Sequence, residues 1–233
     1  MSSPLEVKIK SGTFYLSSKE EQTGQYWKAV EVTNPTTGEK LKRWHKEISI
    51  EGNLLYVGMQ DDKFQGRVLS MLVKGQDSET YSLKIPILST KGIKATDPFF
   101  NSLALVLPKL KKGDAIRMFL NSKNKDKKDN LYKNVVVLDG QGQLIKSDVS
   151  FKDVPKWNSK EVVDAFGDKK MEYDPTPSNT FYIQEFMKSV NYFKELKENT
   201  QQQQEHPQTA TTASDFDMPS KGSEEDMDTD LPF

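Results

Sequence analysis

Alternation of apolar and polar residues, interrupted by short turn segments, is the feature that most constrains how this chain can fold. Such alternation covers residues 5–16, 26–33, 41–50, 54–60, 67–74, 80–88, 115–121 and 131–138. A period of two places successive side chains on opposite faces of a sheet. Turn residues such as those of Asn34-Pro-Thr-Thr-Gly38 separate the runs. The sequence therefore predicts a mainly β protein.

The period becomes helical once within this region. Asp97 suits a helix cap, Pro98 suits the first helical position, and apolar residues then recur at helical spacing until Pro108. Asp139-Gly140 is a hairpin signal that precedes residues 143–146. Strands, one short helix and two more strands are the order of an OB-fold, so we expect an OB-fold-like five-stranded barrel with inserted strands. Other small barrels or sandwiches have similar patterning.

The last third of the chain has a different character. A short helix is predicted over residues 159–166, and a longer one over about 180–198, whose apolar stripe favours core or oligomer packing over an external partner. Beyond it, a Gln-rich and then Thr/Ser/Pro-rich stretch has no core-forming pattern. We divide the chain into an OB-like nucleic-acid-binding domain (1–146), a C-terminal extension (147–198), a flexible linker (199–223) and an acidic, disordered tip (224–233).

Composition excludes several kinds of chemistry. The 233 residues contain no cysteine and two histidines, so no disulfide, thiolate metal site or usual zinc site is expected. P-loop, Gly-x-Gly-x-x-Gly, His-Glu-x-x-His and Gly-x-Ser-x-Gly motifs are absent from the sequence. We expect no cofactor and no enzymatic activity, with a metal-dependent DNA enzyme as a less favoured alternative. The absence of a membrane-spanning run or signal peptide predicts a cytoplasmic protein.

The net charge of −1 conceals a strong asymmetry. Residues 199–233 contain eight acidic residues and one basic residue, a net charge of −7, whereas the preceding residues carry 32 basic and 26 acidic side chains, a net charge of +6. A basic body suits a polyanion such as nucleic acid, and a separate acidic tail commonly mediates interactions.

Aromatic residues mixed with Lys and Arg on strands predict a single-stranded DNA face, because bases stack on rings while phosphates meet cations. Val30 and Val32 define an inner face together with Tyr26 and Lys28, so Trp27 points outward and is the best stacking candidate.

Two further strands complete the candidate face. Arg43 and His45 are expected beside Trp27, whereas Trp44 has the parity of Ile48 and is equally compatible with the core. On the strand 115–121, Arg117 and Phe119 lie opposite the core parity, unless the sheet is buried on both faces. The candidate DNA-binding residues are Trp27, Lys42, Arg43, Trp44, Lys46, Arg117, Phe119, Tyr132 and Lys133, the last two following the basic loop 123–128. Tyr15, Tyr56 and Tyr81 are weaker candidates.

The chain ends Asp226-Met-Asp-Thr-Asp-Leu-Pro-Phe233. This ending resembles the acidic C-terminal tip of bacterial single-stranded DNA-binding proteins, in which several aspartates precede Ile-Pro-Phe. The resemblance implies an OB barrel and a tip that docks replication and repair enzymes. The partner-binding residues would be Asp226, Asp228, Asp230, Leu231, Pro232 and Phe233.

The body departs from the bacterial pattern, because the usual N-terminal strand motif is missing and extra strands and a long helix are present. The homotetramer of that family is therefore not implied, and the chain looks more like a divergent or bacteriophage-encoded member. We expect sequence-independent binding and protection of single-stranded DNA in replication, recombination and repair. The alternative is a protein-interaction or assembly module with an acidic, solubilising tail.

Overall fold

The computed structural model describes residues 3–10, 13–34, 36–89, 94–121, 134–163 and 165–205. Strands dominate these residues and the helices are few, so the predicted mainly β class is confirmed. Tyr132, Lys133, the basic loop 123–128 and the acidic tip lie outside the described residues.

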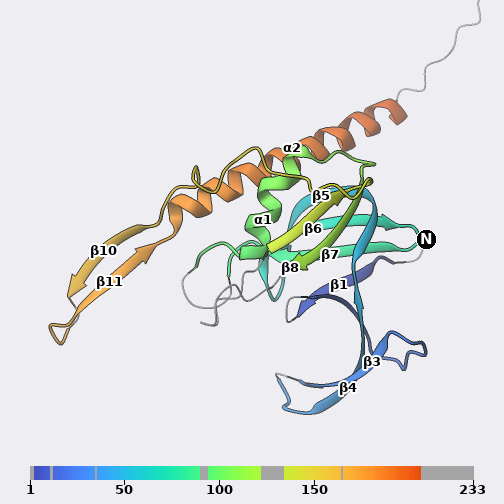
Figure 1. Cartoon of the computed structure of the whole chain (residues 1–233), viewed down its shortest axis with the longest axis horizontal. Helices are drawn as coiled ribbons and strands as arrows, with labels where there is room; N and C mark the ends of the chain where they lie inside the picture. The colour runs from blue at the N-terminus through green and yellow to red at the C-terminus, as the bar shows by residue number, and fades with distance from the viewer. Residues whose placement is uncertain are drawn as a thin grey trace, which may run out of the picture.

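One sheet of nine strands forms the body of the molecule (Figure 1). Its spatial order is β3 (Trp27–Thr33), β4 (Lys40–Ile48), β2 (Thr13–Ser18), β1 (Leu5–Lys10), β7 (Thr80–Pro86), β6 (Gly66–Gly75), β5 (Ile50–Asp62), β8 (Ala115–Asn121) and β9 (Asn134–Asp139). Neighbouring strands are antiparallel except for β1 and β7, which are parallel. No pairing between described residues joins β3 to β9, so the sheet is open there.

Most strands fall where alternation predicts them. The predicted strand 5–16 forms two antiparallel strands, β1 and β2. The turn at Asp139 is confirmed, because the Asp139 N–H donates to the Gln143 carbonyl at 2.9 Å. Beyond it only Leu144 forms an isolated bridge, with Leu138, in place of the expected strand over 143–146.

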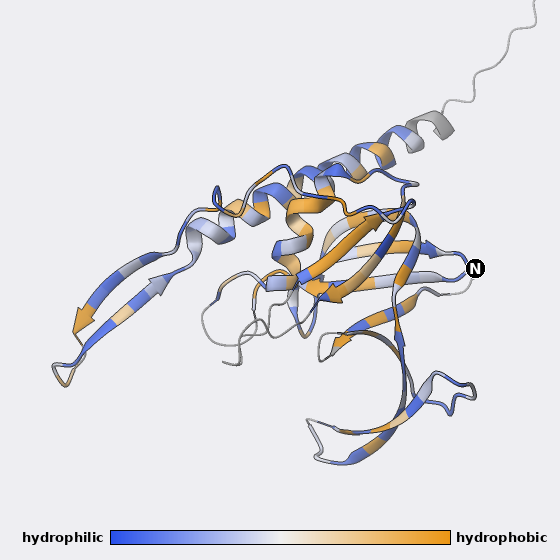
Figure 2. Cartoon of the chain, viewed as in Figure 1, coloured by the Kyte–Doolittle hydropathy of each residue, from blue (hydrophilic) through white to orange (hydrophobic). Residues whose placement is uncertain are grey.

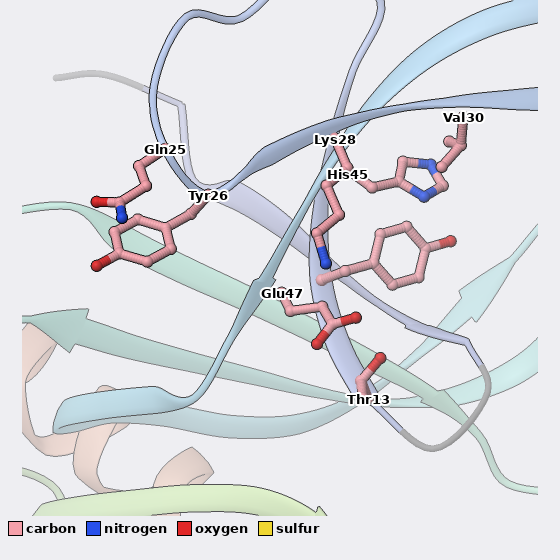
Figure 3. A pocket seen from close by; sticks show the side chains of 8 residues that line it. Thr13, Gln25, Tyr26, Lys28, Val30, His45 and Glu47 are labelled. Atoms are coloured by element: carbon pink, nitrogen blue, oxygen red, sulfur yellow. The ribbon is translucent and has the colours of Figure 1, made fainter.

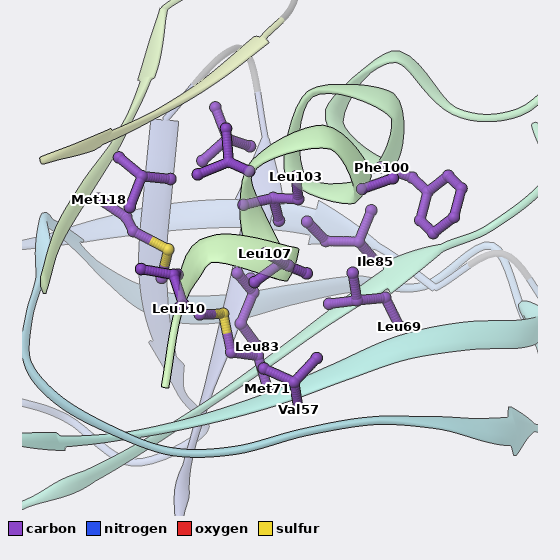
Figure 4. Packing of buried hydrophobic residues seen from close by; sticks show 14 of the residues in the cluster. Val57, Leu69, Met71, Leu83, Ile85, Phe100, Leu103, Leu107, Leu110 and Met118 are labelled. Atoms are coloured by element: carbon purple, nitrogen blue, oxygen red, sulfur yellow. The ribbon is translucent and has the colours of Figure 1, made fainter. Parts of the chain in front are cut away.

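The helix α1 (Pro98–Val106) begins as predicted, and the 3₁₀ turn η1 (Leu107–Lys109) follows it. Asp97 caps α1, with its side-chain oxygen accepting from the Phe99 N–H at 2.8 Å. The helix is buried against the sheet because its apolar residues meet those of β5, β6 and β7 (Figure 4). Figure 2 shows the same concentration of apolar residues around α1 and these strands.

The long helix α2 (Thr176–Glu205) belongs to this core. Phe186 is fully buried and its ring lies 5.4 Å from that of Phe100 in an edge-on arrangement. The expected core packing of the apolar stripe is therefore confirmed. The helix is longer than predicted, since it includes residues 199–205 at the start of the expected linker.

The prediction of a helix over residues 159–166 is wrong. These residues fall largely in β10 (Asn158–Val163), which pairs with β11 (Lys169–Asp174) in a separate two-stranded sheet. Gly167 has a φ of +86°, which suits a turn between the two strands. The helical pattern is overridden because hydrogen bonds to residues beyond Gly167, and not local spacing, decide the conformation. We call this hairpin the arm; it projects from the body (Figure 1).

Candidate nucleic-acid interface

The strands β3 and β4, which we call the wing, extend the main sheet past the buried core (Figure 1). The wing has no buried residue on either strand, and its side chains are half-buried or exposed. Both of its faces are therefore candidates for a ligand.

The strand register sorts the predicted residues onto these two faces. Trp27 lies opposite Lys46, and Ala29 lies opposite Trp44. Cross-strand partners point to the same side of a sheet. Trp27 therefore shares a face with Lys42, Trp44 and Lys46, which we call the tryptophan face.

Arg43 and His45 lie on the other face, with Lys28 opposite His45 and Val30 opposite Arg43. The prediction that Trp27 and Arg43 share one binding face is wrong. The division of each strand into two alternating sets holds, but the expectation that Trp27 points outward is also wrong, because its face continues the core side of the sheet while Val30 lies on the outer side with Arg43. Which faces of two strands coincide depends on their pairing register, which alternation alone does not give.

The tryptophan face continues the core side of the sheet. Trp44 has the parity of Ile48, whose partner across the strand pair is the buried Phe14. The Lys42 Nζ lies 5.1 Å from the centre of the Trp44 ring, a cation–π contact. Trp27 and Trp44 are both half-buried. Their rings are thus engaged within the protein to a large extent.

The opposite face is hollowed. Two adjoining hollows, of about 340 Å³ and 560 Å³, share Tyr15 and His45, and together we call them the outer groove. The groove is lined by Thr13, Tyr15, Gln25, Tyr26, Lys28, Val30, His45 and Glu47 in the first hollow, and by Glu6, Lys8, Tyr15, Ser17, Lys19, Val32, Arg43 and His45 in the second.

Aromatic rings and cations alternate along this groove. The rings of Tyr15 and His45 are 4.5 Å apart between centroids, with an angle of 40°. Tyr26 is 67% exposed. The lining carries four lysine or arginine side chains against two glutamates. Such a surface suits single-stranded nucleic acid, whose bases stack while its phosphates meet cations.

Three of these cations have no internal partner. Lys19, Lys28 and Arg43 make no ion pair with another residue in the part of the chain that the structure describes, whereas Lys8 lies 3.7 Å from Glu6. Burial, and secondarily the charge of Glu6, raises the pKa of Tyr15, so its phenol stays protonated at neutral pH. The groove therefore presents the neutral phenol of Tyr15 beside three cations that form no ion pair with another described residue.

A third hollow continues the groove toward β7 through Glu6, Lys8 and Tyr15. It is less suited to a polyanion, because Asp62 and Asp97 also line it and the Asp62 carboxylate lies 3.9 Å from Lys84. Hydrogen bonds from the Phe64 and Gln65 N–H groups are the main reason that the pKa of Asp62 is lowered.

Arg117 and Phe119 point outward from β8, as predicted, since Ile116 and Met118 beside them are buried. The alternative of a strand buried on both faces is wrong, because Phe119 is 39% exposed. The Arg117 Nε lies 3.7 Å from a Glu51 carboxylate oxygen. Neither residue lines the outer groove, so the structure does not unite them with the wing residues.

The groove contains residues that the sequence reading undervalued. The sequence makes Tyr15 a weak candidate. It places Tyr26 and Lys28 on an inner face, because they alternate in phase with Val30 and Val32. Both valines are in fact only half-buried, since the wing lies past the core. The position of Tyr15 next to Phe14, which is buried, is the signal that places the Tyr15 side chain on the face away from the core.

Other kinds of site find no support within the described ranges. They contain no group of three or more His, Asp or Glu residues placed to hold a metal ion. None of their helices is long and apolar enough to cross a membrane. Comparisons with protein-family models, curated proteins and solved structures found no match for the chain.

Proposed function

We propose that this protein binds single-stranded DNA with little sequence preference and protects it during replication, recombination or repair. The observation that carries the proposal is the outer groove, in which the exposed ring of Tyr26 and the half-buried rings of Tyr15 and His45 lie among three cations that form no ion pair with another described residue. Each base stacked on an aromatic side chain is worth ~1–3 kcal/mol, so a few such contacts suffice for useful affinity. The proposed role is non-enzymatic and cytoplasmic, in a bacterial cell and encoded by the host or a bacteriophage.

An OB-fold-like architecture is part of this proposal. The order β5, β6, β7, α1, β8, β9 is three strands, a helix and two strands, as in that fold. A closed barrel would return its last strand to β7, whereas the second edge of β7 pairs with β1 here. We regard the sheet as an opened relative of the barrel, extended by β1 to β4.

Partner recruitment is assigned to the acidic tip. Phe233 would fill an apolar pocket on a replication or repair protein, its carboxylate would meet a basic residue there, and Asp226, Asp228 and Asp230 would engage surrounding cations. The resemblance of the last residues to the bacterial tips supports this role.

Binding of labelled oligo-dT to the intact protein tests the DNA function, with Tyr26→Ala as the diagnostic variant. Loss of a stacking ring is expected to weaken binding about tenfold, within the ~1–3 kcal/mol range for one base. Tyr173→Ala is the matched control, because Tyr173 is 52% exposed on the arm and does not line the groove. Equal affinities of both variants and the intact protein would remove the groove from the proposal.

A protein-interaction module is the second candidate, and the arm favours it. Phe166 is 92% exposed and Val163 is 63% exposed on this hairpin. Exposed apolar groups of this kind commonly mark contact surfaces. A protein that fails to bind oligo-dT at low salt would favour this candidate.

A further inference from the structure

The first hollow of the outer groove is large enough to accept one base. Its volume is about 340 Å³, near the lower limit of roughly 300 Å³ for small-molecule pockets. Figure 3 shows Tyr26 on one side of the hollow and His45 on the other, with the Glu47 carboxylate between them in this view. Tyr26 is 67% exposed and can stack on a base placed there, whereas the His45 ring packs against Tyr15 with 4.5 Å between centroids.

The hollow also contains an acceptor and a donor at neighbouring positions of one sheet face. Lys28 lies opposite His45, and Glu47 is two residues further along β4 on the same face. Such diagonal neighbours have Cα atoms roughly 7–8 Å apart. Lys28 and Glu47 are both exposed and neither makes an ion pair with another described residue, so both side chains are available to a ligand.

A carboxylate is an unfavourable neighbour for DNA phosphates, and its place in the groove needs a reason. Glu47 repels a polyanion unless the carboxylate faces the base edge, where it accepts hydrogen bonds from N–H groups. The charge of Glu47 therefore argues for a group that contacts bases.

The base edges differ in what they offer to a carboxylate. Guanine presents two adjacent N–H donors, N1–H and N2–H₂, beside the O6 acceptor. Adenine and cytosine place a ring-nitrogen acceptor next to their amino group, and thymine places a carbonyl on each side of its N3–H. Guanine alone gives a carboxylate two parallel hydrogen bonds while offering O6 to an ammonium group, and charge-assisted bidentate pairs are the strong ones.

From this geometry we infer that the hollow formed by Tyr26, Lys28, His45 and Glu47 is a guanine subsite. Glu47 accepts from N1–H and N2–H₂, Lys28 donates to O6, and Tyr26 stacks on the base. The inference rests on the proposed DNA function and adds one base preference to a groove that is otherwise tolerant of sequence.

The experiment compares oligo-dT with strands of equal length in which one central thymidine is replaced by dG, dA or dC. Because a dT strand can slide, a single dG can reach the hollow. The dG strand is expected to bind about five- to tenfold more tightly than the others, at the lower end of the range for one bidentate base contact. Equal affinities for the four strands would overturn the inference and leave the DNA function standing.

Two variants locate the preference. Glu47→Gln is expected to abolish the dG advantage, because one acceptor is lost, and to raise oligo-dT affinity, because the negative charge that repels phosphates is lost. Glu31→Gln is the matched control, since Glu31 shares the tryptophan face with its partner Lys42 and is expected to keep the full preference. A dG advantage that survives Glu47→Gln in a protein with an unchanged melting temperature contradicts the inference.

Free guanosine monophosphate and an RNA strand with one guanosine separate the sources of the base. A preference for guanine that depends on Glu47 in both DNA and RNA supports a subsite that contacts the base and not the sugar. Glu47-dependent binding of the free nucleotide without any affinity for oligo-dT would keep the guanine site and refute the DNA function. No binding of any probe would refute both.

Discussion

The wing and the arm are two β-hairpins that project from the same body and expose aromatic side chains, yet they differ in charge and support. Residues 26–48 of the wing carry five basic and three acidic residues, a net charge of +2, whereas residues 157–174 of the arm carry three and five, a net charge of −2. β4 continues the main sheet through β2, whereas β10 and β11 pair only with each other among the described residues. We therefore expect DNA on the wing and not on the arm, because phosphates require cations beside the rings on which bases stack.

Removing charge from the wing is expected to have the largest effect on DNA binding. Lys28→Ala combined with Arg43→Ala should lower oligo-dT affinity by about tenfold or more, since a hydrogen bond contributes roughly 0.5–1.5 kcal/mol and one to a charged group contributes more. In oligo-dT, which offers Lys28 no guanine, both cations are expected to meet phosphates. The slope of log affinity against log salt concentration should therefore become shallower by about 1.4, at about 0.7 per phosphate contact in single strands. A titration at several salt concentrations measures both quantities.

Lys160→Ala with Lys169→Ala in the arm is the matched control for this variant. The arm pair should leave affinity and salt slope unchanged. A lower oligo-dT affinity for the arm variant than for the wing variant would indicate that the arm, and not the wing, binds DNA.

A smaller change in oligo-dT affinity is expected to show which face of the wing binds DNA. Trp44→Ala removes a half-buried ring from the tryptophan face and should weaken oligo-dT binding less than about threefold, below the ~1–3 kcal/mol of a stacked base. Tyr26→Ala on the groove face is the reference in the same titration. A larger loss for Trp44→Ala, with an unchanged melting temperature, would move the DNA to the tryptophan face.

The tail is expected to act on DNA binding only weakly. Deletion of residues 226–233 removes negative charge and should leave oligo-dT affinity equal or somewhat higher, while binding to a purified bacterial enzyme that recognises Asp-Ile-Pro-Phe tips should be lost. Asp→Asn at 226, 228 and 230, with Phe233 kept, separates charge from the apolar end. A deletion that markedly weakens DNA binding at fixed salt contradicts this assignment.

The smallest expected effect concerns stability in acid and involves Asp77, in the turn between β6 and β7. A hydrogen bond from the Tyr81 hydroxyl to the Asp77 carboxylate, at 2.6 Å, is the main cause that lowers the pKa of Asp77, and Lys46 of the wing contributes least. Burial, followed by this hydrogen bond, raises the pKa of Tyr81 to about 12.

Because the pKa of Asp77 is lower in the folded state, its contribution to stability is present above the unfolded pKa of about 3.9 and is lost as pH falls through the folded value. Asp77→Asn should therefore flatten the acid limb of the unfolding free energy. Urea unfolding at several pH values checks this, and an unchanged acid limb would show that Asp77 does not contribute.

Local patterns in the sequence predicted much of the fold. The Asp97 cap, the burial of Ile116 and Met118, and the apolar stripe of α2 follow from residues close together in the chain. The two strands of the arm were not predicted, because they are defined by pairing with each other across Gly167. The site was predicted only in part, since parity separates the faces of one strand but register decides which faces of β3 and β4 coincide.

Hydrogen–deuterium exchange with and without oligo-dT tests the central claim most directly, because it compares wing and arm in one protein. We expect slower exchange on DNA binding in β2, β3 and β4, and unchanged exchange in β10 and β11. Protection confined to the arm, or none in the wing at saturating DNA, would contradict it.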